Sequence, residues 1–100
     1  MYCASVVYPI DAENFDVDYF ATRHAPLFAA ALGENCVRFE VHRALDVPGA
    51  PSPSFIAAGY FWVQSPEQFG AALAAHGDEI YADIQNFSGT QPSRGWAAVL

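Results

Sequence analysis

The chain has 100 residues, 53% of them hydrophobic, which is enough for one compact core and too little for two domains. Eleven acidic residues stand against four arginines and no lysine, and this net charge of −7 argues against nucleic acid or an anionic membrane as partner. No apolar run reaches the ~18 residues of a membrane span and no basic leader precedes the first strand-like segment, so we expect a single cytoplasmic domain over residues 1–100.

The first predicted element is a strand at residues 2–8, which is rich in β-branched and aromatic side chains. Pro9 ends it, because proline cannot donate to a sheet ladder. A helix is expected next, with Asp16 as its cap and residues 16–32 as its extent, and Gly33 follows as a helix-ending residue.

One face of this helix is apolar except for a single ionisable side chain. At about 100° per residue, His24 lies near the centre of an arc roughly 140° wide. Pro26 removes one hydrogen bond within the helix and predicts a kink near Thr22, and a loosened turn of this kind often lines a cavity. The apolar residues of the arc are Val17, Phe20, Ala21, Leu27, Phe28, Ala31 and Leu32.

The middle of the chain predicts two strands separated by a loop. Residues 36–44 alternate between apolar and polar side chains, and the polar side carries Arg38, Glu40 and His42, which is typical of a solvated edge. Residues 45–54 contain three prolines and a glycine and predict a loop. The strand expected at residues 55–63 is apolar on both faces.

The last two elements are a helix and a strand. Ser65 predicts the helix cap, with Pro66 in the first turn and Gln68 at the capping-box position. Gly77 is expected to end or interrupt this helix, and Asp78 to cap a short continuation. The final strand is expected at residues 95–100. The predicted inner stripe of the helix comprises Phe69, Ala72, Leu73 and His76.

This order of elements predicts a ferredoxin-like α+β sandwich, βαββαβ, with a four-stranded antiparallel sheet and both helices on one face. Two helices can cover only one side of the sheet, whereas the last two strands are apolar on both sides. We therefore expect a homodimer built as an α+β barrel, in which a second copy covers the other face and buries Tyr60, Trp62 or their opposite-face neighbours.

His24 is the candidate catalytic residue, because a neutral imidazole in an apolar cleft can give or take one proton near neutral pH. The alternative is a core histidine bonded to a nearby carbonyl. Asp83 falls on the inner arc if the second helix continues past Gly77, and it could orient a histidine, cap a backbone or bind an arginine. His76 is more simply a helix-end residue.

The aromatic side chains suit either a pocket for an apolar organic molecule or an ordinary core. The candidate pocket residues are Phe20, Phe28, Phe61, Trp62, His76, Ile80, Asp83 and Phe87. Cys3 and Cys36 have no metal-ligand spacing around them, so we expect free thiols and no metal site, with a disulfide left open.

Three motifs resemble the EthD family, named for a protein of ethyl tert-butyl ether degradation: Tyr8-Pro9, FDVDYFATRHAPL at residues 15–27 and HGDEIYADIQNFSGTQP at residues 76–92. The resemblance implies a dimeric α+β barrel, places the family's histidine at His24, and maps its late Asp and Asn-Phe onto Asp83, Asn86 and Phe87. Proteins with this barrel include metal- and flavin-free monooxygenases, cyclases, lactone isomerases and haem-dependent peroxidases, so the fold alone does not select a reaction.

Two functions remain open from the sequence. The first is an EthD-like enzyme or pathway auxiliary that uses His24, without a cofactor, for proton-transfer chemistry such as isomerisation, cyclisation, dehydration, decarboxylation or cofactor-free oxygenation. The second is a non-catalytic ligand-binding or assembly protein in a catabolic or secondary-metabolite pathway, in which His24 is a buried core residue.

Overall fold

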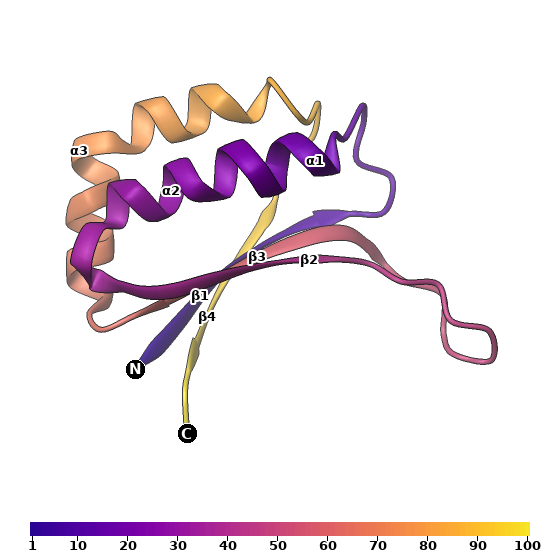
Figure 1. Cartoon of the computed structure of the whole chain (residues 1–100), viewed down its shortest axis with the longest axis horizontal. Helices are drawn as coiled ribbons and strands as arrows, with labels where there is room; N and C mark the ends of the chain where they lie inside the picture. Colours follow the sequence, from indigo (N-terminus) through magenta and orange to yellow (C-terminus); the bar gives the residue numbers. More distant parts are fainter.

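The computed structural model describes all 100 residues and places the helices on one face of a four-stranded antiparallel sheet (Figure 1). The strands are β1 (Tyr2–Pro9), β2 (Cys36–Arg43), β3 (Phe55–Val63) and β4 (Ser93–Ala98), in the spatial order β2-β3-β1-β4. The helices are α1 (Val17–Tyr19), the π-helical turn η1 (Phe20–His24), α2 (Ala25–Leu32), the 3₁₀ turn η2 (Gly33–Asn35) and α3 (Pro66–Ile84). The predicted βαββαβ sandwich is confirmed, and no helix is long and apolar enough to cross a membrane.

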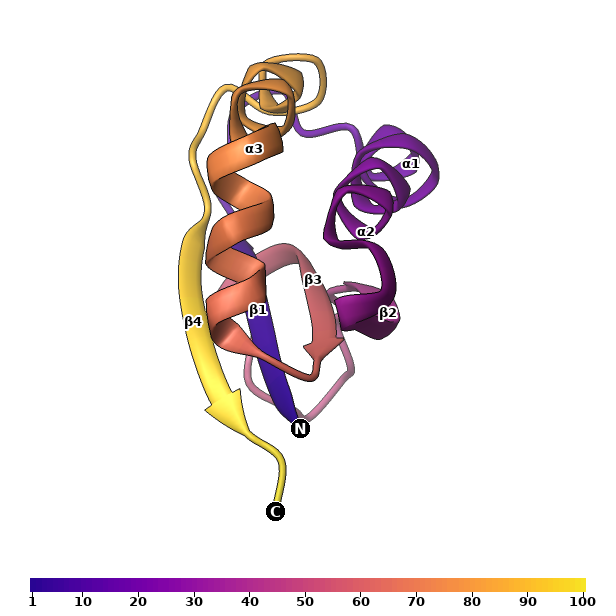
Figure 2. The ribbon, with the colours of Figure 1, turned by 90° about the vertical axis from the view of Figure 1, so that its left-hand side faces the viewer.

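The core lies between the sheet and the helices. In β1, alternate residues Ala4, Val6 and Tyr8 are buried on the helix side, as the period of two in a strand requires. The helical layer has two halves: α3 lies on the β4 side and α2 on the β2 side (Figure 2). The largest fully buried side chains are Tyr8, Phe20, Phe61, Phe87, Ile80 and Val63.

The first helical segment begins where the sequence predicts. The Asp16 side chain accepts a hydrogen bond from the backbone N–H of Tyr19 at 3.1 Å, which satisfies one free donor of the first turn. The predicted disturbance around Thr22 is present, but it takes the form of the π turn η1, in which the N–H of Ala25 bonds to the carbonyl of Phe20. Pro26 has no N–H with which to close a regular turn at this point.

The helix α3 begins as predicted and ends differently. Ser65 caps it by accepting from the N–H of Gln68 at 3.2 Å. Contrary to the prediction, Gly77 does not end the helix and Asp78 does not cap a new one, because α3 runs unbroken to Ile84, although its axis bends (Figure 1). Gly77 is buried without a positive φ, and a Cβ there would lie 3.3 Å from the Tyr81 ring, so its small size serves packing.

The last strand is shifted by two residues from the predicted range 95–100. Ser93 already pairs with Val7, and Ala98 pairs with Tyr2, the first residue of β1. Residues 99–100 therefore run past the end of the partner strand. This register also brings Arg94 into the strand, opposite Val6.

The far face of the sheet carries side chains that the helices do not cover. Arg38 pairs in register with Trp62, and Glu40 with Tyr60. The Arg38 guanidinium lies 4.0 Å from the centre of the Trp62 ring and donates to Glu40 at 3.0 Å. His42 bonds the same carboxylate at 3.2 Å. The prediction of a solvated polar trio on β2 is confirmed.

Candidate functional site

His24 lies at the end of the π turn, with 2% of its surface exposed, between the two helical halves. Its Nδ1 lies 2.8 Å from Oδ2 of Asp83 on α3. Three phenylalanines surround the ring, and the nearest, Phe87, has its ring centre 4.5 Å from that of His24. Asp83 was expected to orient a histidine, cap a backbone or bind an arginine, and the structure shows that it orients the His24 imidazole through a hydrogen bond.

Both oxygens of Asp83 are occupied. Oδ1 accepts a hydrogen bond from the hydroxyl of Tyr19 at 2.6 Å and another from the amide of Asn86 at 3.0 Å, while Oδ2 faces His24. Burial on its own raises the pKa of Asp83, but the hydrogen bonds from Tyr19, Asn86 and His24 together outweigh it and lower that pKa. Asp83 is therefore ionised and acts purely as an acceptor.

The protonation of His24 follows from these contacts. Burial lowers the pKa of His24, and the hydrogen bond and charge of Asp83 only partly oppose this effect, so the imidazole is neutral at physiological pH. An ionised Asp83 can only accept, so the single ring proton sits on Nδ1. Nε2 then carries a free lone pair, the form that a general base requires.

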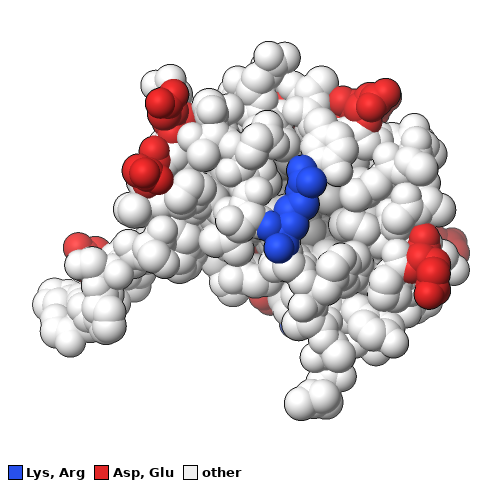
Figure 3. Space-filling view, turned by 180° about the vertical axis from the view of Figure 1, so that it is seen from behind, with Lys and Arg blue, Asp and Glu red and all other residues white.

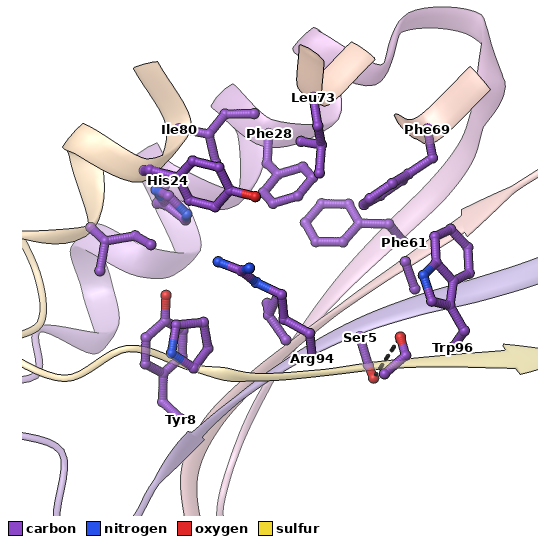
Figure 4. A pocket seen from close by; sticks show the side chains of 16 residues that line it. Ser5, Tyr8, His24, Phe28, Phe61, Phe69, Leu73, Ile80, Arg94 and Trp96 are labelled. Carbon is purple, nitrogen blue, oxygen red and sulfur yellow. Dashed lines mark hydrogen bonds between the residues drawn. The ribbon is translucent and has the colours of Figure 1, made fainter. Parts of the chain in front are cut away.

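Nε2 of His24 opens onto a cavity between the helices and the sheet. It makes no hydrogen bond within the protein, yet no buried side-chain nitrogen or oxygen lacks a partner, so Nε2 must be accessible. Figure 4 shows His24 facing this space from the helices, with Tyr8 and Arg94 pointing towards it from the sheet. Eleven of the 16 lining residues are hydrophobic.

The cavity is small and partly open. Its volume is about 60 Å³, room for a few waters. Arg94 and Trp96 of β4 line it and are exposed side chains, and the Trp96 ring leans edge-on against Phe69, with ring centres 4.8 Å apart. These two exposed side chains therefore form the solvent side of the cavity.

Six of the eight predicted pocket residues lie at the site, in two groups. Phe28, Phe61 and Ile80 line the cavity together with His24. Asp83, Phe20 and Phe87 contact the His24 ring from behind without lining the cavity.

Two of the predicted pocket residues are not in the pocket. Trp62 follows Phe61 on the strand, so the alternation of side chains sends it to the far face of the sheet. His76 is exposed, whereas the next residue, Gly77, faces the interior together with Ile80 and Ile84.

Sequence reasoning missed three polar residues of this region. Tyr8 and Arg94 line the cavity and Tyr19 binds Asp83. The inward direction of Tyr8 and Arg94 could have been inferred from the sequence, because side chains two apart on a strand share a face. Tyr8 lies two residues from the inward Val6, and Arg94 lies two residues from Trp96, which lines the cavity. Both cysteines are free and half-buried, and no group of three or more His, Cys, Asp or Glu side chains is placed to hold a metal ion.

Comparison with known proteins gives consistent matches. The model of the EthD domain matches residues 8–91. An EthD-like protein from Ralstonia eutropha JMP134 is 33% identical, with a TM-score of 0.89 over 99% of this chain and 91% of that one. An ethyl tert-butyl ether degradation (EthD) family protein from Bacillus halodurans C-125 is 14% identical, with a TM-score of 0.72 over 99% and 97%.

A third structure, HapK from Hahella chejuensis, is 16% identical, with a TM-score of 0.67 over 100% of this chain and 93% of that one. At these lower identities, the Bacillus and Hahella structures show the shared fold alone. No curated protein sequence matches the chain.

Proposed function

Because the chain belongs to the EthD family, whose domain and structures suggest a role with small molecules, we propose that it is a cofactor-free enzyme in which His24 accepts and returns a proton of an apolar organic substrate. The observation that carries this proposal is the pairing of His24 Nδ1 with an ionised Asp83 at 2.8 Å, which leaves Nε2 as a base at the cavity.

Three features support proton transfer over a passive core role. The lowered pKa of His24 keeps the imidazole in its neutral, proton-accepting form. Asp83 stabilises the imidazolium that forms when Nε2 takes up a proton, much as a carboxylate supports histidine in other acid–base sites. A histidine that served packing alone would not need an open Nε2 facing a mostly apolar pocket.

Such a base can act on substrates that carry an acidic C–H or O–H group. Removal of a proton next to a carbonyl group or from a phenol starts isomerisation, cyclisation and decarboxylation, and it also activates a substrate for reaction with oxygen without a cofactor. The apolar lining favours the hydrocarbon part of such a molecule through burial.

The test is proton exchange, because it does not require the overall reaction to be known. A panel of ketones, 1,3-dicarbonyl compounds and carbon acids is incubated with the protein in D₂O, and loss of the acidic C–H signal is followed by NMR. We expect exchange of at least one compound, and a loss of about 10²-fold or more in His24→Ala. His76→Ala is the matched control, because His76 is exposed on α3 and should exchange like the wild type.

Compounds that bind near His24 without any exchange would contradict the proposal and favour a binding protein. A large loss of stability in His24→Ala, with ligand binding intact, would have the same meaning. Melting curves of both variants check that each remains folded.

A further inference from the structure

Two polar groups of the cavity have no role in the His24–Asp83 pair. The first is the hydroxyl of Tyr8, a side chain that is 1% exposed and whose oxygen makes no hydrogen bond within the protein. Since no buried side-chain oxygen lacks a partner, this hydroxyl must reach the cavity. This hydroxyl is therefore free to donate a hydrogen bond to a ligand that enters the pocket.

The second group is the guanidinium of Arg94. It is the one cationic side chain among the lining residues, and it forms no ion pair and no hydrogen bond. Its Cζ lies 4.8 Å from the centre of the Tyr81 ring, and this cation–π contact steadies the side chain beside the cavity. Eleven acidic residues were available in the chain, yet none pairs with Arg94.

Charge is unevenly distributed over the molecule. Seen from the side opposite Figure 1, one group of basic atoms lies near the middle of the face and acidic side chains lie towards its margins (Figure 3). In a chain of net charge −7, an exposed arginine without an acidic partner, such as Arg94, is a place where an anion meets less repulsion.

We propose that Arg94 and the Tyr8 hydroxyl form an oxyanion-binding subsite facing His24, so that the substrates are enolisable or phenolic compounds whose oxygen becomes negative as His24 removes the proton. This rests on the proposed function. The guanidinium supplies planar, permanently charged donors and the phenol a further donor, the combination that stabilises an enolate or phenolate oxygen.

The proposed step balances without an oxidant. Nε2 of His24 forms the new N–H bond, the C–H or O–H bond of the substrate breaks, and its electron pair becomes the negative charge on oxygen. Donation from Arg94 and Tyr8 holds that charge until the imidazolium returns the proton. Burial strongly raises the pKa of Tyr8, against a smaller lowering by Arg94, so the phenol stays protonated and able to donate.

The test compares two probes of similar shape. The first is 4-nitrophenol at a pH at which it is ionised, and the second is the uncharged 4-nitroanisole. Isothermal titration calorimetry should show that the wild type prefers the phenolate. In Arg94→Gln, phenolate affinity should fall by about tenfold to a hundredfold, the range expected for a charged hydrogen bond, with little change for the anisole.

Arg43→Gln is the matched control: it removes the same charge from β2, outside this cavity, and should bind both probes like the wild type. Tyr8→Phe should weaken phenolate binding by a smaller factor. Equal affinity of the wild type for both probes, or an equal loss of both in Arg94→Gln, would overturn the subsite.

The same titration in His24→Ala separates the two proposals. An Arg94-dependent preference for the phenolate that persists in this background supports the subsite, even if no proton exchange is found in the wild type. Exchange that depends on His24, without any preference for the phenolate, would leave the proposed function standing and remove the subsite.

Discussion

Replacement of Asp83 by asparagine should change the tautomer of His24. The amide has nearly the same shape as the carboxylate, so Tyr19 and Asn86 can still donate to its carbonyl oxygen, but an NH₂ group then faces Nδ1 of His24. Two donors cannot bond each other. The ring proton therefore moves to Nε2, and the lone pair that faced the cavity is lost.

The cost in stability follows from the same contacts. A hydrogen bond to a charged acceptor contributes about 1.5–3 kcal/mol and one to a neutral acceptor about 0.5–1.5 kcal/mol. The two bonds retained at Oδ1 weaken because their acceptor becomes neutral, but Asn86 is exposed and water compensates part of this loss. The bond to His24 is remade in the new tautomer. We expect the free energy of unfolding of Asp83→Asn to fall by about 1 kcal/mol, measured by urea denaturation.

The tautomer is read from long-range ¹H–¹⁵N correlations of the histidine rings, with His42→Asn and His76→Asn used to assign the three signals. Asp78→Asn is the control, because it removes the same charge from an exposed position of α3. It should alter neither the tautomer nor the stability by more than a few tenths of a kcal/mol. A His24 ring that keeps its proton on Nδ1 in Asp83→Asn would refute the assignment of Asp83 as the group that sets it.

Three further outcomes are expected. The free energy of unfolding should fall as the pH drops below about 6.5, because the pKa of His24 is lowered in the folded state and the unfolded chain binds the proton first. In His24→Gln, a urea-denaturation series over pH should not show this decrease. A decrease that persists in the variant would mean that another group causes it. Phe87→Ala should cost about 3–5 kcal/mol, since its ring is 1% exposed and contacts five other rings, and a loss below 1 kcal/mol would mean that the neighbours collapse into the space. We propose that a second copy covers the far face of the sheet, so light scattering should give twice 10.8 kDa and Trp62→Glu should give monomers; a monomeric wild type would contradict this.

Much of the fold could be predicted because its signals are local. The alternation along residues 36–44, the apolar run at residues 55–63 and the caps at Asp16 and Ser65 each act within a few residues, and the structure places strands and helix starts there. Gly77 misled the prediction, because a glycine can serve close packing as well as a helix end, and only the position of Tyr81 distinguishes the two.

The site was only partly predictable, for geometric reasons. The contact between His24 and Asp83 joins residues 59 positions apart, so no local pattern sets it. His76 was placed inside because the inner arc of α3 was centred on Phe69, Ala72 and Leu73, whereas the buried residues Gly77, Ile80 and Ile84 centre it away from His76. Trp62 could have been excluded from the pocket by its neighbour, since Phe61 already faced the core.

The π turn before Pro26 has a consequence for Asp83. On a regular α-helix, residues five apart point about 140° away from each other, so Tyr19 and His24 could not reach one carboxylate. The extra residue in the turn gives this pair the relation of neighbours four apart, and both side chains meet Asp83. If these residues formed a regular α-helix of the same sequence, the two donors would point apart, so the irregular turn is what allows one acid on α3 to hold two side chains of the other helical segment.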